Sequence, residues 1–124
     1  MGHTTFKVMN PGVLFVITTD PRTSPRPAEA VRIAAGVGAW RKAAVTIYLR
    51  DAAVLALSEF PDELTDGHNF SRYLPLVEES SGVLCAQRGA PWLREIGRAP
   101  VSFREIDDEE LATLALESHY LIRF

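Results

Sequence analysis

Apolar residues gather in five short runs along the chain, and their composition predicts β-strands. Residues 13–18 (VLFVIT), 44–49 (AVTIYL) and 82–86 (GVLCA) are almost continuously apolar and rich in β-branched side chains. Runs of this kind are typical of strands that helices cover on both faces of a sheet. Residues 101–106 (VSFREI) and 119–124 (HYLIRF) mix charged and apolar positions, which predicts strands at the edges of the sheet.

Helical patterns fill the intervals between these runs. Residues 26–40 have a proline, Pro27, suited to a first helical turn and place four apolar residues on one face: Ala30, Ile33, Ala34 and Val37. Residues 51–58 and 69–81 predict two more helices, the second kinked or interrupted by Pro75. A short helix is expected over 91–97. Asp107, followed by Glu110, predicts the N-cap of a last helix that includes 111–118.

Strands that alternate with helices predict an α/β fold. We expect a single domain over residues 1–124, with a mainly parallel five-stranded sheet as the middle layer of a three-layer α/β/α arrangement. In such folds ligands bind outside the carboxyl ends of the strands. The loops expected at that edge follow the strands at 13–18, 44–49, 82–86 and 101–106.

Composition narrows the classes of function. The net charge is -3, whereas a nucleic-acid-binding domain usually has a strongly basic face, so no nucleic-acid partner is expected. No apolar run approaches the ~20 residues of a membrane span, and the first residues lack the pattern of a signal peptide. A single cysteine cannot form an internal disulfide and agrees with a cytoplasmic location. The scattered histidines predict no metal site, and no organic cofactor is expected.

Cys85 is the residue with the most distinctive chemistry. It lies where the apolar run at 82–86 ends, which predicts a thiol at the exit of a strand, and Arg88 follows three residues later. A cation and helix-terminal N–H groups stabilise a thiolate, the nucleophilic form of cysteine. The competing interpretation is a small buried hydrophobe, because free cysteine is among the most buried residue types.

Other thiol chemistries are less well supported. A phosphatase or rhodanese loop would carry an arginine six residues after Cys85, where the chain has Pro91. A Cys/His hydrolase would need His3, His68 or His119 to fold against Cys85, which spacing alone does not indicate. A hydrolase or a reductase is the third possible function and would be recognised by catalytic turnover.

The arrangement of these segments resembles the DsrE/DsrF family of small sulfur-relay proteins, which includes the TusD-like carriers. The resemblance covers almost the whole chain and rests on four stretches: the helix PAEAVRIAAG after the first strand, the strand VTIYL with a short helix after it, GVLCAQRGA, and the C-terminal LATLALESHYLIRF. It implies that Cys85 accepts a persulfide sulfur and that the chain assembles as a homo-oligomer, a dimer, trimer or hexamer, or with related subunits. The family often has a glycine-containing turn after the second strand, where this chain has Arg50 and Asp51.

These observations predict a sulfur-relay protein, a persulfide carrier or sulfurtransferase, that exchanges sulfur with donor and acceptor proteins. Cys85 would be the catalytic residue, and four residues would form the binding site: Gln87, Arg88, Arg50 and Asp51. Arg22 and Arg26, in a proline-stiffened loop, would attract an anionic sulfur donor toward Cys85. The alternative is a non-catalytic subunit of the same fold that binds a small anion or nucleotide, or acts in assembly. Residues 51–60 (DAAVLALSEF) are the predicted interface between subunits.

Overall fold

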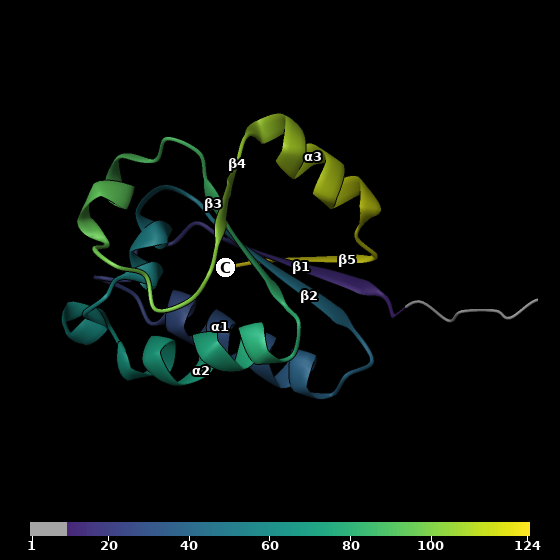
Figure 1. Cartoon of the computed structure of the whole chain (residues 1–124), viewed down its shortest axis with the longest axis horizontal. Coiled ribbons are helices and arrows are strands. Elements are labelled where there is room, and N and C mark those ends of the chain that lie inside the picture. The colour runs from purple at the N-terminus through teal and green to yellow at the C-terminus, as the bar shows by residue number, and fades with distance from the viewer. Residues whose placement is uncertain (1–9) are drawn as a thin grey trace, which may run out of the picture.

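The computed structural model describes residues 10–124 and contains one parallel β-sheet with helices on both faces (Figure 1). The strands are β1 (Gly12–Ile17), β2 (Ala44–Leu49), β3 (Val83–Gln87), β4 (Arg104–Ile106) and β5 (Tyr120–Arg123). The α-helices are α1 (Arg26–Ala39), α2 (His68–Glu79) and α3 (Asp108–Glu117). Three short 3₁₀ helices are η1 (Asp51–Leu57), η2 (Pro61–Glu63) and η3 (Pro91–Glu95).

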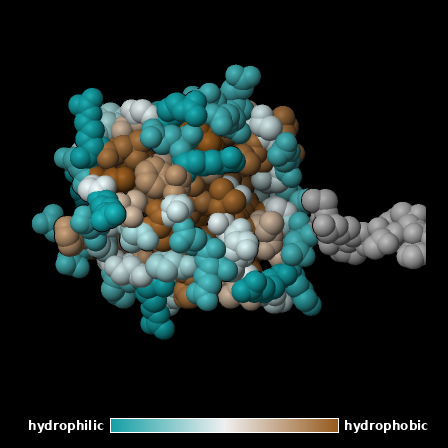
Figure 2. All heavy atoms as spheres, viewed as in Figure 1, coloured by the Kyte–Doolittle hydropathy of each residue, from teal (hydrophilic) through white to brown (hydrophobic). Residues whose placement is uncertain are grey.

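The strand order is β4-β3-β2-β1-β5, and every neighbouring pair is parallel. The predicted α/β class and the edge positions of the last two strands are therefore confirmed. Helices α1 and α2 lie together on one face of the sheet and α3 lies on the other (Figure 1). In the same view, apolar residues gather across the middle of the molecule, between α3 and the layer of α1 and α2 (Figure 2).

The two faces of the sheet are packed very differently. The α1 and α2 face holds the main hydrophobic core, to which the buried residues of η1 also belong. The α3 face holds a second, smaller cluster of four buried residues: Leu14, Tyr48, Cys85 and Ile106. No residue of α3 is itself fully buried, so a single lightly packed helix covers this cluster.

Several predicted elements differ in detail from those observed. The segment at 51–58 forms a 3₁₀ helix rather than an α-helix. Helix α2 continues through Pro75, contrary to the predicted interruption. Proline removes the hydrogen bond to the carbonyl group four residues earlier, and both Pro75 and that residue, Ser71, are exposed, so water can bind the carbonyl group instead.

The predicted interface at 51–60 is not available as an apolar surface. Residues Ala53–Leu57 are buried in the core of their own chain, and only Phe60 remains as a large exposed apolar side chain, 77% exposed. The apolar run reflects internal packing of η1 against the sheet. Among residues 10–124, no helix has the length and apolar character needed to cross a membrane.

Candidate functional site

Cys85 lies in the middle of β3 and not at its end, so the predicted strand-exit position is wrong. The strand continues to Gln87 because Cys85, Ala86 and Gln87 all pair with β4, an interaction that the local apolar pattern does not reveal. The thiol-bearing residue has 0% exposure and packs within the cluster under α3. In its present conformation the thiol is a buried core group.

Arg88 is bound to acidic groups at the start of α3. Its guanidinium group forms ion pairs with Asp107 at 3.4 Å and Glu110 at 3.1 Å, and donates to the carbonyl oxygen of Glu105 at 3.0 Å. These two carboxylates also form the capping box of α3, in which each side chain accepts from the other residue's backbone N–H. Arg88 therefore ties β3 to α3, and its charge is already compensated.

Gln87 and Asp51 are in direct contact, as expected for residues at the carboxyl ends of neighbouring strands. The side-chain oxygen of Gln87 accepts a hydrogen bond from the backbone N–H of Asp51 at 2.9 Å. Asp51 adopts φ +54°, a left-handed conformation that glycine favours and aspartate tolerates better than most residues. The turn for which the family resemblance leads one to expect glycine is thus formed here by aspartate.

Arg50 joins β2 to α3. One of its terminal nitrogens, Nη1, donates to the hydroxyl oxygen of Tyr48 at 2.9 Å and contacts a carboxylate oxygen of Asp108 at 2.8 Å. The hydrogen bond from Arg50 lowers the pKa of Asp108. The hydrogen bonds with Asp108 and Tyr48 raise the pKa of Arg50. Burial raises the pKa of Tyr48, against the opposing effects of the hydrogen bond from Arg50 and of the Arg50 charge. Tyr48 is therefore a neutral phenol at physiological pH, and Arg50 is a cation.

A cavity of about 380 Å³ opens beside this pair, between α3 and the carboxyl ends of β1, β2 and β5. Its charged residues are Arg50, Arg123 and Asp108, and its apolar wall is formed by five residues: Val16, Leu111, Ala112, Ala115 and Leu121. Arg123 forms no ion pair among residues 10–124. The cavity thus has two cations, one carboxylate and a largely apolar wall.

The same helix lines this cavity and covers the cluster that contains Cys85. Val16, Leu111 and Ala115 line the cavity and also pack against the cluster that contains Cys85. The cavity and the thiol therefore lie on the same face of the sheet, and the cavity shares lining residues with the cluster around Cys85.

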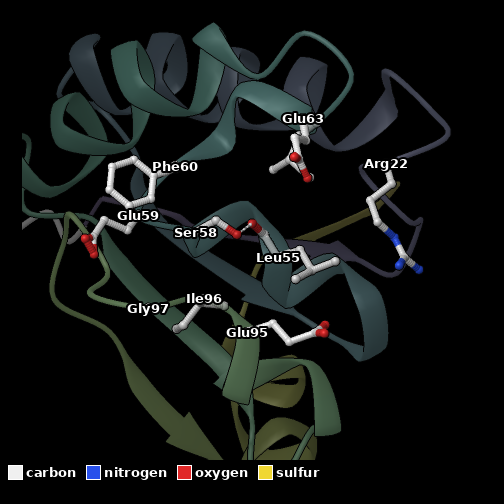
Figure 3. A pocket seen from close by; sticks show the side chains of 10 residues that line it. Arg22, Leu55, Ser58, Glu59, Phe60, Glu63, Glu95, Ile96 and Gly97 are labelled. Carbon is white, nitrogen blue, oxygen red and sulfur yellow. Dashed lines mark hydrogen bonds between the residues drawn. The ribbon is translucent and has the colours of Figure 1, made fainter.

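A second cavity, of about 350 Å³, lies between the 3₁₀ helices (Figure 3). Its charged lining residues are Glu59, Glu63, Glu95 and Arg22. Arg22 is bound to Asp20 and lies over the ring of Trp92, 4.2 Å from its centre. Three carboxylates against one compensated cation make this cavity unsuitable for an anion.

The loop arginines do not converge on Cys85 as predicted. Arg22 lines the second cavity, and the guanidinium group of Arg26 lies 5.6 Å from the ring centre of Phe124. Arg22 is thus held by Asp20 and Trp92, and Arg26 lies beside Phe124, so neither side chain faces Cys85.

The histidines do not form a dyad with Cys85 in the described part of the chain. The Nδ1 atom of His119 accepts a hydrogen bond from the backbone N–H of Gly12 at 3.0 Å, at the start of β1, and His68 begins α2 on the opposite face of the sheet. His3 lies outside the described residues. Within 10–124, no group of three or more His, Cys, Asp or Glu residues is arranged to hold a metal ion.

Similarity to other proteins is detected at the level of structure. No protein-family model and no curated protein sequence matches the chain. The crystal structure of YchN from Escherichia coli superposes with a TM-score of 0.73 and 19% sequence identity, covering 92% of this chain and 99% of YchN. The chain has the DsrE/DsrF-like fold of YchN. At this identity the likeness establishes the fold alone.

The sequence indicated only part of this site. Arg50, Asp51, Gln87 and Arg88 all lie at the carboxyl ends of β2 and β3. They form three separate networks, those of Arg50, of Asp51 with Gln87 and of Arg88, and none of them is bonded to Cys85. Tyr48, Asp108 and Arg123 were not predicted. The one local signal for a role of Arg123 is that a charged residue stands near the end of the apolar run at 119–124.

Proposed function

We propose that this protein is a binding subunit of the DsrE/DsrF-like fold that holds a small organic anion at the carboxyl ends of β1, β2 and β5. The observation that carries the proposal is the cavity between α3 and the sheet, in which Arg50 and Arg123 stand beside an apolar wall. Its volume of about 380 Å³ lies within the range of small-molecule sites, which are typically apolar with a few charged groups that orient the ligand.

The charges of the cavity define the ligand class. Two guanidinium groups and one carboxylate leave one net positive charge, which favours a singly charged head group over the multiply charged phosphates of a nucleotide. Nη1 of Arg50 makes both of its bonds, so the other N–H donors of that group and all those of Arg123 can bind a carboxylate. The ligand is therefore a monocarboxylate or similar monoanion with an apolar body.

The proposal is tested with phenylacetate as the probe. Its binding is measured from the chemical shifts of the backbone amides during a titration. Phenylacetamide has the same body without the charge, and acetate has the charge without the body, so both should bind more weakly. A hydrogen bond to a charged group contributes ~1.5–3 kcal/mol, so Arg123→Gln should weaken phenylacetate binding by about tenfold to a hundredfold. Arg72→Gln, on α2 at the opposite face, is the matched control.

Two results would contradict the anion site. One is equal affinity for phenylacetate and phenylacetamide, which would show that charge plays no part. The other is an Arg123→Gln variant that binds phenylacetate as tightly as Arg72→Gln does.

Sulfur relay through Cys85 is the second candidate function. It is supported by the residues Val16, Leu111 and Ala115, which line the cavity and also pack against the cluster that contains Cys85, and by the light packing of α3 over that cluster. In this reaction the Cys85 thiolate attacks the outer sulfur of a donor persulfide, the donor's S–S bond breaks, and the donor leaves as a thiolate while Cys85 keeps the sulfur as a persulfide. Because Cys85 is buried, α3 must move for the attack to occur.

This candidate is tested by incubating the reduced protein with glutathione persulfide and weighing it intact. Relay requires that the wild-type protein gain one sulfur atom, that a reductant remove it, and that Cys85→Ser gain nothing. If Cys85 of the native protein reacts with neither iodoacetamide nor the persulfide while the cavity binds phenylacetate, sulfur relay is contradicted. Anion binding is then the one function that stands.

A further inference from the structure

The two edge strands of the sheet differ in character. At one edge, β4 is only three residues long and exposes the charged residues Arg104 and Glu105. Short strands and exposed charges are the usual means by which proteins prevent an edge from pairing with another chain. At the other edge, β5 exposes Tyr120, Leu121 and Ile122, with exposed fractions of 62%, 41% and 39%. The β5 edge has no comparable protection until Arg123.

The backbone of β5 also has hydrogen-bonding groups directed away from the sheet. Both groups of Phe124 bond toward β1: its N–H donates to Val16 and its carbonyl oxygen accepts from Thr18, each at 2.9 Å. Direction alternates along a strand, so the N–H and C=O groups of Leu121 and Arg123 point to the outer edge. Within residues 10–124 no strand pairs with that edge.

The exposed apolar side chains lie on both faces of β5. Tyr120 and Ile122 are in register with Val13 and Phe15 of β1, which face the α1 core. Leu121 is in register with Leu14, which faces α3. A partner that covered only one face of the sheet would leave one of these sets exposed, so a strand added at the edge suits β5 better than a helix packed on a face.

We propose that a second copy of this chain pairs with the protein through β5, antiparallel and about a two-fold axis perpendicular to the sheet. Such an axis keeps each face of the sheet on its own side, so residues that face each other across it must belong to the same face. In the register centred on Leu121, that residue lies opposite the partner's Leu121, and Tyr120 lies opposite the partner's Ile122. All three exposed apolar side chains of β5 then meet apolar partners.

A second copy is the occupant that this strand fits best because the strand is complementary to itself. The outward N–H and C=O groups of Leu121 face the same groups of the partner's Leu121, which gives a hydrogen-bonded pair. The two sheets become one continuous ten-stranded sheet whose outer edges are both β4, the strand with exposed charges. Pairing through β5 thus covers the apolar edge and leaves the charged one free.

The proposal is tested by sedimentation equilibrium of the full chain at micromolar concentrations. We expect the wild-type protein to have twice the mass of one chain. Leu121→Lys places two like charges opposite each other at the axis and should give a monomer. Leu76→Lys, a leucine of α2 with a similar exposed fraction of 44%, should remain dimeric. Circular dichroism checks that both variants are folded.

A cross-link tests the register independently of stability. Leu121→Cys should form a disulfide-linked dimer under mild oxidation, whereas wild type, with only the buried Cys85, and Leu76→Cys should not. A monomeric wild type, or a Leu121→Lys variant that stays dimeric, overturns the proposal. Tyr120→Lys, whose side chain lies on the face away from the anion cavity, should give a monomer that still binds phenylacetate, so failure of the interface and failure of the anion site are distinguishable.

Discussion

At the scale of single residues, the environment of Cys85 leads to a prediction about stability. Its side chain is fully buried among Leu14, Tyr48 and Ile106, so the hydroxyl group of Cys85→Ser would be placed in a largely apolar site. A buried polar group without a partner costs ~1–3 kcal/mol, and we expect the free energy of unfolding to fall by about that amount. Cys85→Ala, which adds no polar group, should be less destabilising than Cys85→Ser.

Urea denaturation of the three proteins measures this difference. If Cys85→Ser were as stable as the wild type, the thiol would have to be solvated or bonded to a polar group, and its assignment as a core residue would be wrong.

Asp108 gives a prediction about pH. Arg50 lowers the pKa of Asp108 below its usual value of 3.8, so the charged form is favoured in the folded protein. The stabilisation that results is present above the unfolded pKa and is lost as pH falls through the folded pKa. Asp108→Asn should therefore be less stable than wild type at pH 7, and the two should converge at acid pH below that range.

The same substitution should affect the ligand in the opposite direction. Removing the Asp108 carboxylate raises the net charge of the cavity from one to two, so phenylacetate should bind Asp108→Asn several-fold more tightly at low salt and lose that gain at high salt. Urea denaturation at several pH values and the amide titration measure the two effects. Glu109→Gln, which changes an exposed acid in the same turn of α3, is the matched control. Unchanged affinity in Asp108→Asn would show that its carboxylate does not face the ligand.

At the scale of elements, α3 is the part of the fold on which access to Cys85 depends. Asp107 caps this helix by accepting from the backbone N–H of Glu110 at 2.8 Å, and it also binds Arg88. Replacing a capping aspartate by alanine costs ~0.5–2 kcal/mol, and no residue of α3 is deeply buried to compensate. Asp107→Ala should therefore increase the rate at which iodoacetamide modifies Cys85.

The comparison variant is Asp107→Asn, because asparagine is also a good N-cap residue. Its modification rate should stay near that of the wild type. Equal rates for Asp107→Ala and the wild type would show that the thiol becomes accessible by global unfolding and not by movement of α3.

The elements themselves were largely predictable because their signals are local. The apolar runs indicated all five strands, and Asp107 with Glu110 indicated the cap of α3, since both patterns depend on residues that are close in sequence. The position of Cys85 within β3 was not predictable in this way. Gln87 extends that strand because it pairs with Ile106, a contact between segments that have no common local pattern.

At the scale of the whole molecule, the candidate site depends on contacts that sequence spacing does not encode. Arg50 and Asp108 are 58 positions apart, and Arg123 reaches the same cavity because β5 pairs with β1. The general rule that ligands bind at the carboxyl ends of parallel strands points to the edge of the sheet at which the proposed anion cavity lies. Which side chains meet there followed only from the strand order and from the packing of α3.

The cavity and the proposed dimer interface share β5, and this arrangement predicts that the two are coupled. Leu121 and Arg123 line the cavity, and Leu121 would lie at the two-fold axis, so the partner's Leu121 would extend the apolar wall around a bound ligand. An anion that binds the dimer more tightly than the monomer must strengthen dimerisation by the same factor, because the two equilibria are linked.

Phenylacetate should therefore lower the dimer dissociation constant of the wild type, and phenylacetamide should not. The Tyr120→Lys monomer should bind phenylacetate more weakly than the wild-type dimer, while Leu76→Lys should behave as wild type in both measurements. Sedimentation with and without phenylacetate, and titrations above and below the dimer dissociation constant, give the two coupling factors independently. If the ligand leaves the dissociation constant unchanged while binding the cavity, the partner's β5 does not reach the ligand.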